Sequence, residues 1–412
     1  MSLNTNMMKL VFRYTTALLI LVILLASCEE KQSEEPKINT CIPTGVPGEL
    51  VNAEYIMPIT SGQVKAIIDS YLPFNTFDFE ELSVEVYSVS YKTQDKNDEL
   101  IPVSGVMFVP VGIDNLDIVS TQHGTSIKRT DVGSDNFLNA IDGLLMSMQG
   151  CLVVAPDYIG LGESDLLHPY LHAELSANAV IDMIRAGRAF ACDREISLSD
   201  RVLLSGYSEG GYVTLATQKI METEFTEEFD LLGVAPMAGP FDLLGTTRSI
   251  LNQDSYENPA LLAYLVTAYN DVYDWDRLDD VFQEPYASLM PKLFDGTIGA
   301  DSINSQLPNS IDSLFLTNFK QSFLAGNDST IEAALIANAF EGWGPIAPVR
   351  LIHGTDDDIV PFENSEFVYS SMLANGGVSV DLVPLLGADH LTGAIFAYEL
   401  AGVWFDSLRA ND

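Results

Sequence analysis

The strongest chemical signal in the sequence is a serine flanked by glycines. Gly206-Tyr207-Ser208-Glu209-Gly210 matches the pattern G-x-S-x-G and lies between an apolar run at 201–205 and a helix-prone stretch at 211–216. A serine on such a tight strand-to-helix turn is exposed and can act as a nucleophile. The glycines tolerate the strained backbone that this turn requires. We therefore predict that Ser208 attacks a carbonyl carbon, helped by the dipole of the helix that follows it.

A serine hydroxyl is a weak nucleophile and needs a neighbouring base, together with an acid that orients the base. The predicted base is His390, in a loop directly after the apolar run at 378–384. The acid is expected after the preceding apolar run, where the chain has three consecutive aspartates, Asp356, Asp357 and Asp358. A carboxylate there would hold the imidazole in the tautomer that accepts a proton from serine.

The elements that must position these residues follow from the hydrophobic pattern. From residue 82 onward, short apolar runs alternate with amphipathic stretches, which predicts βα units and a mainly parallel sheet. The expected strands are at 84–91, 102–109, 117–122, 151–155, 202–206, 231–237, 348–353 and 378–384. The expected helices are at 135–148, 174–191, 209–222, 363–374 and 393–408.

The alternation of strands and helices is interrupted after Gly239-Pro240. Residues 241–345 are helix-prone and rich in aromatic side chains, and they contain no strong strand signal. We predict that they form a helical cap inserted between two core strands, with the core made of 49–240 and 346–412. A separate domain with its own role is the alternative.

Several segments together resemble the α/β-hydrolase superfamily, over residues from about 80 to 410. They are Gln122-His123-Gly124-Thr125, the stretch 155–164, and Gly206-Tyr207-Ser208-Glu209-Gly210-Gly211, followed by the acid and histidine loops. Within the superfamily the chain is similar to secretory lipases and related bacterial esterases. The resemblance implies an α/β-hydrolase fold: a mostly parallel, eight-stranded sheet flanked by helices, with an inserted helical cap. It also implies a catalytic triad in the order Ser208, Asp357, His390.

The resemblance also suggests roles for the remaining site residues. Gly354 to Pro361 reads G-x-x-D-x-x-V-P, which resembles the acid loop of many α/β-hydrolases and favours Asp357, with Asp356 and Asp358 as alternatives. The oxyanion hole is expected to use the backbone N–H of Glu209 and that of Thr125 or Gly124, with Thr125 slightly favoured. Two tyrosines are candidates for lining the substrate site, Tyr158 and Tyr207.

Other polar residues indicate no metal or cofactor. His123 is interpreted as a structural residue of its loop rather than a second base. His168 and His172 lack the spacing of metal ligands, and the acidic clusters lack the spacing of a calcium loop. Neither a Gly-rich dinucleotide motif nor a Walker loop occurs, so we expect no cofactor.

The composition narrows the range of partners. The chain has 412 residues, 47% of them apolar, which is enough for one large core. Its formal net charge is −38, from 58 acidic and 20 basic residues. Such a surface repels phosphate backbones, so nucleic acid is not an expected partner.

Residues 1–27 resemble the signal peptide of a bacterial lipoprotein. An apolar stretch at 17–25 leads into Leu25-Ala26-Ser27-Cys28, which resembles a lipobox and implies cleavage before Cys28 and a lipid on its sulfur. An ordinary secretory signal is the alternative. Residues 28–48 have the composition of a flexible tether. We expect a lipid anchor in the bacterial cell envelope, at the outer membrane or cell surface rather than free in the periplasm.

Three further cysteines remain, Cys41, Cys151 and Cys192. Their number leaves at least one thiol unpaired within the chain, and the sequence does not specify the pairing. Cys151 opens an apolar run and is expected to be a small buried residue.

The predicted function is that of a serine hydrolase that cleaves carboxylic esters, of small molecules or lipids, through an acyl-enzyme on Ser208. A serine peptidase of the same fold acting on short peptides is one alternative. A lipid-anchored binding module without catalytic activity is a second. The sequence leaves the acyl length, the leaving group and the oligomeric state open.

Overall fold

A computed structural model describes residue 41 and residues 43–71 and 82–411. The predicted signal peptide, the predicted lipidation site Cys28 and most of the predicted tether lie outside the described residues. Within the described part of the chain, none of the helices has the length and apolar character needed to cross a membrane.

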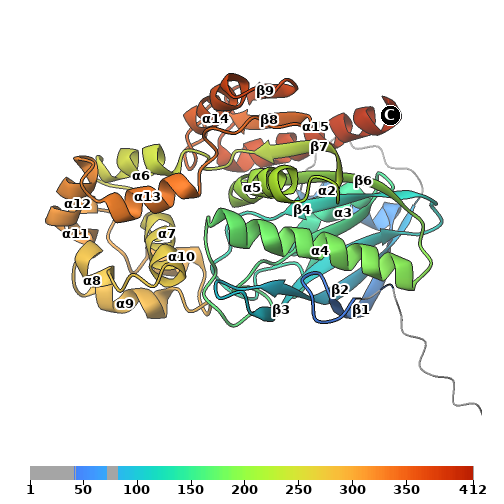
Figure 1. The fold of residues 1–412 in the computed structure, drawn as a ribbon, viewed down its shortest axis with the longest axis horizontal. Coiled ribbons are helices and arrows are strands. Elements are labelled where there is room, and N and C mark those ends of the chain that lie inside the picture. The colour runs from blue at the N-terminus through green and yellow to red at the C-terminus, as the bar shows by residue number, and fades with distance from the viewer. Residues whose placement is uncertain (1–40, 42, 72–81, 412) are drawn as a thin grey trace, which may run out of the picture. The chain divides into compact units, whose positions relative to one another are not determined.

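The described residues form one sheet of nine strands in the order β1-β2-β3-β5-β4-β6-β7-β8-β9 (Figure 1). Strands β4 to β9 pair in parallel, whereas β1, β2 and β3 form antiparallel pairs and β3 lies antiparallel to β5. The strands are β1 (Leu50–Thr60), β2 (Ser83–Gln94), β3 (Leu100–Pro110), β4 (Leu116–Gln122), β5 (Leu152–Pro156), β6 (Leu198–Tyr207), β7 (Asp230–Met237), β8 (Val349–Gly354) and β9 (Val380–Leu385).

The α/β fold class predicted from the sequence is confirmed, but the predicted number of strands, eight, was too low. Each of the eight expected strands overlaps one of β2 to β9. The additional strand, β1, lies at the edge of the sheet, and most of its side chains are exposed. β1 contains apolar residues, some of them exposed at this edge, but Asn52, Glu54 and Pro58 interrupt them, so the segment lacks the continuous apolar run of the central strands.

Alternate residues of the central strands pack on opposite faces of the sheet. Val202 and Leu204 of β6 join the hydrophobic cluster that contains helices α4 (Ala173–Asp193) and α5 (Glu209–Glu224). Leu203, between them, joins the cluster that contains α15 (His390–Asn411). This period of two explains why the later strands are almost entirely apolar: helices cover both faces.

The other helices of the core complete these two layers. Residues of α14 lie in the α4–α5 cluster, and residues of α2 and α3 lie in the α15 cluster. These helices are α2 (Ser61–Tyr71), the short 3-10 helix η1 (Phe137–Ala140), α3 (Ile141–Ser147) and α14 (Glu363–Ala374).

Eight further helices of the described chain occur between β7 and β8, and Figure 1 shows them gathered at one end of the sheet. Their core is aromatic, with Tyr264, Tyr269, Phe282, Phe315 and Phe323 almost completely buried. They are α6 (Leu243–Leu251), α7 (Pro259–Val272), α8 (Leu278–Val281), α9 (Tyr286–Leu293), α10 (Ala300–Asn304), α11 (Ile311–Leu314), α12 (Thr317–Leu324) and α13 (Ser329–Ala337).

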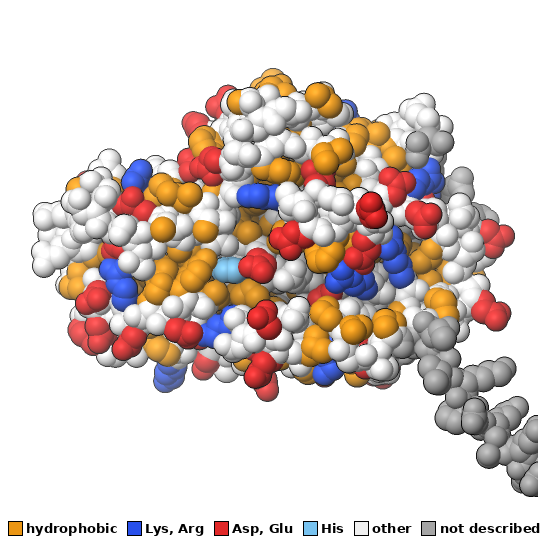
Figure 2. Space-filling view, in the orientation of Figure 1, with side chains coloured by type: hydrophobic (Ala, Val, Ile, Leu, Met, Phe, Trp, Pro, Cys, Tyr) orange, Lys and Arg blue, Asp and Glu red, His pale blue; other side chains and the backbone are white. Residues whose placement is uncertain are grey.

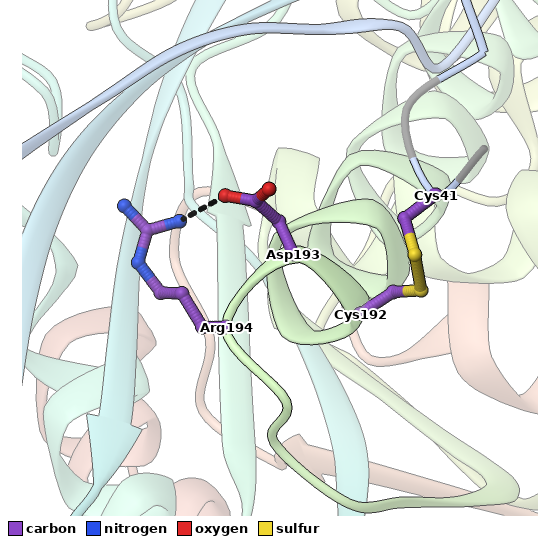
Figure 3. The surroundings of a disulfide bond; sticks show 4 residues. All are labelled: Cys41, Cys192, Asp193 and Arg194. Atoms are coloured by element: carbon purple, nitrogen blue, oxygen red, sulfur yellow. Dashed lines mark ion pairs between the residues drawn. A yellow bond between two sulfur atoms is a disulfide. The ribbon is translucent and has the colours of Figure 1, made fainter. Parts of the chain in front are cut away.

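A disulfide resolves the cysteine pairing that the sequence left open. Cys41 is bonded to Cys192 in the last turn of α4, beside the ion pair of Asp193 and Arg194 (Figure 3). The bond joins residues 151 positions apart and fastens the start of the described chain to α4. Cys151 is a buried free thiol, as predicted, and burial raises its pKa to about 12.

Acidic side chains are spread over the face shown in Figure 2 and do not gather in one patch. On this face the negative charge is therefore distributed and has the character of a solvated surface.

Candidate active site

Ser208 occupies a sharp bend between β6 and α5. Its backbone has φ 61° and ψ −123°, and its N–H donates a 2.9 Å hydrogen bond to the carbonyl of Met237 on β7. A Cβ at Gly206 would collide with the backbone of Gly210, and one at Gly210 would collide with the carbonyl of Gln122 on β4. Both glycines of the motif are therefore required by close backbone contact, and the bend directs the serine out of the sheet.

His390 begins α15 and contacts the serine directly. The Ser208 hydroxyl donates to His390 Nε2 over 3.0 Å. The backbone carbonyl of His390 accepts a 2.9 Å hydrogen bond from the hydroxyl of Tyr207. The histidine is largely buried, and Tyr207, which directly precedes Ser208, helps to hold the start of α15 in place.

Asp357 lies on the other side of the imidazole. His390 Nδ1 donates to Asp357 Oδ2 over 2.6 Å, while Asp357 Oδ1 accepts from the backbone N–H groups of Ile359 and Val360 at 3.0 and 2.8 Å. The Asp357 side chain is fully buried. Asp356 and Asp358 are exposed, so the middle of the three aspartates is the one that the fold brings to the histidine.

His353, on β8, is a member of this group that the sequence analysis missed. Its Nε2 faces both Asp357 Oδ2 at 3.2 Å and the carbonyl of Val360 at 2.9 Å. Because that carbonyl can only accept, Nε2 carries the proton, and Nδ1 can accept from the hydroxyl of Ser365 at 2.8 Å. The one signal in the sequence was a histidine four residues before the aspartate, at the end of the strand.

These contacts determine the ionisation of Asp357. Burial by itself would raise the pKa of the carboxyl group. Hydrogen bonds from His353, His390 and the Val360 N–H outweigh it and hold the pKa of Asp357 well below its ordinary value. The carboxylate is therefore charged at neutral pH, as an acid that stabilises a protonated imidazole must be.

The residues predicted to form an oxyanion hole lie around Ser208. A Cβ on Gly124 would lie 3.7 Å from the Cβ of Ser208, and Thr125, Ser208 and Glu209 line one cavity. Within the described part of the chain, the backbone N–H groups of Gly124, Thr125 and Glu209 donate to no other backbone group. The geometry leaves these amides available, without selecting between Gly124 and Thr125.

The two tyrosines suggested as lining residues differ. Tyr207 borders the wider cavity beside Ser208, although most of its ring is buried against His390. Tyr158 is completely buried; its hydroxyl donates to the carbonyl of His123 over 3.0 Å, and its ring stacks on the ring of that histidine. The structure therefore places Tyr158 in the packing around the site and not on the wall of either cavity next to the serine.

Two cavities of different character meet at Ser208. The smaller has a volume of about 70 Å³ and is largely apolar; α6 and α7 contribute seven of its sixteen lining residues, including Leu243, Ile250, Leu261, Leu262 and Leu265. The wider cavity has a volume of about 760 Å³ and carries more polar groups, including Lys128, Asp131, Asn139, Asn258, Asp301 and Asn304. The described residues contain no cluster of side chains that could hold a metal ion.

One family model matches this chain, and several solved structures are similar to it. A family model described as secretory lipase matches residues 121–411. A comparison with curated proteins finds no match. Among solved structures, a candidate hydrolase from Legionella pneumophila is 28% identical with a TM-score of 0.81, covering 87% of this chain and 98% of its own.

Two further structures are similar in fold. The rice cell wall degrading esterase LipA from Xanthomonas oryzae is 28% identical with a TM-score of 0.77, covering 89% of this chain and 99% of its own. Lipase A from Candida antarctica, in its closed state, is 16% identical with a TM-score of 0.65, covering 88% of this chain and 82% of its own; at this identity the likeness concerns the fold alone.

The lowered pKa of Asp357 predicts a pH-dependent contribution to stability. A carboxyl group whose pKa is lowered by folding adds stability above its ordinary pKa of about 4, and this contribution is lost as the pH falls further. We expect Asp357→Asn to lower the melting temperature most near neutral pH, with the gap to wild type narrowing as the pH falls below about 5 and continuing to narrow below about pH 3. Asp356→Asn, at an exposed neighbour, is the control. A gap that does not change with pH would contradict this explanation.

Proposed function

The chain belongs to the secretory lipase family, and from this premise we propose that it hydrolyses carboxylic esters through an acyl-enzyme on Ser208. Family membership and the similarity to esterases support an ester hydrolase. The observation that carries the mechanism is the chain of hydrogen bonds from Ser208 through His390 to Asp357, 3.0 and 2.6 Å long.

In the acylation step, the Ser208 oxygen attacks the ester carbonyl and its proton passes to His390 Nε2. Asp357 keeps Nδ1 protonated and stabilises the imidazolium that forms. The carbonyl oxygen becomes an oxyanion, which the N–H of Glu209 and one N–H of the 124–125 loop would stabilise. When the tetrahedral intermediate collapses, the carbon–oxygen bond to the alcohol breaks and His390 returns the proton to the leaving oxygen.

Deacylation repeats these steps with water. The oxygen of a water molecule attacks the acyl carbon while His390 takes a proton from that water. The bond between the acyl carbon and the Ser208 oxygen then breaks, and His390 returns the proton to the Ser208 oxygen. The products are the free acid and the regenerated enzyme, so no cofactor is needed to balance the reaction.

The two cavities suggest where each half of the ester binds. The apolar cavity suits the acid portion, because its leucine and isoleucine side chains would remove an acyl chain from water. The wider cavity suits a polar alcohol, because its amide, carboxylate and ammonium groups can form hydrogen bonds. A peptide substrate is the less favoured alternative, since no feature of either cavity indicates a peptide.

The helices α6 to α13 would act as the cap that the sequence predicted for residues 241–345. Seven of the sixteen residues that line the apolar cavity beside Ser208 belong to α6 and α7. Ester selectivity would therefore depend on these inserted helices, whereas the catalytic groups come from the core strands and the loops after them.

We further propose that the protein is held in the cell envelope by a lipid on Cys28. Membership of a secretory family supports an extracellular or envelope location. We expect a Cys28→Ala variant expressed in its bacterial host to lose incorporation of labelled palmitate and to leave the membrane fraction. Palmitate incorporation equal to that of wild type would contradict lipidation at Cys28.

The nucleophile is tested by replacing two serines of the same segment. Ser208→Ala removes the attacking oxygen, and we expect kcat for p-nitrophenyl acetate to fall by at least about 10⁴-fold. Ser205→Ala is the matched control, because Ser205 is buried on β6 and its hydroxyl has no hydrogen-bond partner in the described part of the chain. Substantial activity in Ser208→Ala, or wild-type protein that is inert towards esters, would refute the proposed function.

The role of the apolar cavity is tested on α7. Leu265→Trp would fill the cavity, so we expect kcat/KM for p-nitrophenyl octanoate to fall at least about 10-fold relative to that for the acetate. Leu278→Trp, on α8 and outside both cavities next to Ser208, should leave the ratio of the two substrates unchanged. An unchanged ratio in Leu265→Trp would mean that the acyl chain binds elsewhere.

A further inference from the structure

The residue after the candidate nucleophile is a glutamate, and its charge poses a problem for the proposed reaction. Glu209 is the first residue of α5, and its side chain is fully buried. A buried carboxylate at this position repels the negative charge that develops on the substrate oxygen, while the backbone N–H of the same residue is needed to stabilise that charge. The oxyanion hole can therefore work well only if the carboxylate is neutralised.

His168 is placed to neutralise Glu209. His168 Nε2 lies 2.7 Å from Glu209 Oε1, and His168 Nδ1 lies 2.8 Å from the carbonyl oxygen of Ile159. A carbonyl only accepts, so Nδ1 carries a proton. The contact between Nε2 and Oε1 then requires a second proton, held by either the imidazole or the carboxyl group. In both arrangements the pair has no net charge.

The surroundings of Glu209 offer no comparable partner. Among the described residues, His168 is the basic side chain within ion-pair distance of Glu209. The other oxygen, Oε2, is buried and makes no hydrogen bond to any described residue. Four tyrosines near Glu209 remain neutral, because burial raises their pKa values and the Glu209 carboxyl raises them further. They are Tyr158, Tyr170, Tyr212 and Tyr264.

Stacked rings connect His168 to the other side of the oxyanion hole. The Tyr158 ring lies between the rings of His168 and His123, with centroids 5.7 and 4.2 Å away. His123 directly precedes Gly124 and Thr125. The packing that fixes His168 therefore also fixes the loop expected to supply the second N–H donor.

We propose that His168 is a positioning residue for catalysis, which neutralises Glu209 and fixes the first turn of α5 so that the Glu209 N–H faces the oxyanion without an opposing charge. The inference rests on the proposed function, because it assigns His168 a role in ester hydrolysis at Ser208. A histidine with a purely structural role would contribute to stability, and the effect of its replacement on kcat would not depend on the presence of the Glu209 carboxyl group.

A double-mutant cycle separates these roles. The full chain is purified as wild type, His168→Gln, Glu209→Gln and the double variant, and kcat, KM and melting temperature are measured with p-nitrophenyl acetate as substrate. Glutamine at 168 keeps a hydrogen-bonding group but cannot carry the proton. With Glu209 present, we expect His168→Gln to lower kcat about 100-fold with KM changed less than about 3-fold. In the Glu209→Gln background, the His168→Gln substitution should lower kcat by less than about 3-fold.

A second buried histidine provides the matched control. His172 caps α4 by accepting from the Leu175 N–H, and His172→Gln should lower kcat by the same factor in both backgrounds. Suppose that the wild-type protein is active. If His168→Gln lowers kcat by the same factor in both backgrounds, or leaves kcat unchanged when Glu209 is present, the inference is wrong and the proposed function stands. Wild-type protein that does not hydrolyse the ester overturns both.

Discussion

The backbone bend at Ser208 is the constraint on which the rest of the candidate site depends. A non-glycine residue at φ 61° is strained, and surrounding packing must maintain it. Here α5 packs so closely on the sheet that side chains at Gly206, Gly210 and Gly211 would collide with the neighbouring backbone. The same contact aims the N-terminus of α5 at the point where negative charge is proposed to form.

The remaining groups reach this bend through the topology of the sheet. Because β6, β7, β8 and β9 are parallel, their carboxyl ends lie on the same side of the sheet, and the residues that follow them come together there. Ser208 follows β6, Asp357 follows β8 and His390 follows β9. The helices between β7 and β8 leave this arrangement unchanged and supply part of the lining of the apolar cavity, together with residues of the core. In the proposed mechanism the core therefore supplies the reacting groups, and the insertion contributes to the site for the acid portion of the ester.

The sequence predicted the features that depend on local pattern. The apolar runs located all strands of the parallel part of the sheet, and the glycine-serine motif located the bend. The histidine and the aspartate were found because each follows a strand that the pattern had marked, although the choice among three aspartates relied on a resemblance. Only folding distinguishes them: it buries Asp357 and leaves its two neighbours exposed.

Other features depend on contacts between distant residues, which no local pattern contains. The pairing of Cys41 with Cys192 spans 151 positions, and the contact of His168 with Glu209 joins residues 41 positions apart, with no spacing in the sequence that predicts the pair. Tyr158 was predicted to line the substrate site because its loop follows a core strand. Its ring instead packs between the rings of His123 and His168. Edge strand β1 was missed because Asn52, Glu54 and Pro58 interrupt its apolar residues.

Covalent labelling of Ser208 is the sharpest test of the proposed nucleophile, because it reports on the serine itself and does not depend on the choice of substrate. The purified protein is treated with a fluorophosphonate, digested, and its peptides are analysed by mass spectrometry, with His390→Ala treated in parallel. We expect a single adduct on Ser208 in the wild-type protein and labelling that is slower by orders of magnitude in the variant. An adduct on a different residue, or equal labelling of Ser208 without His390, would contradict it.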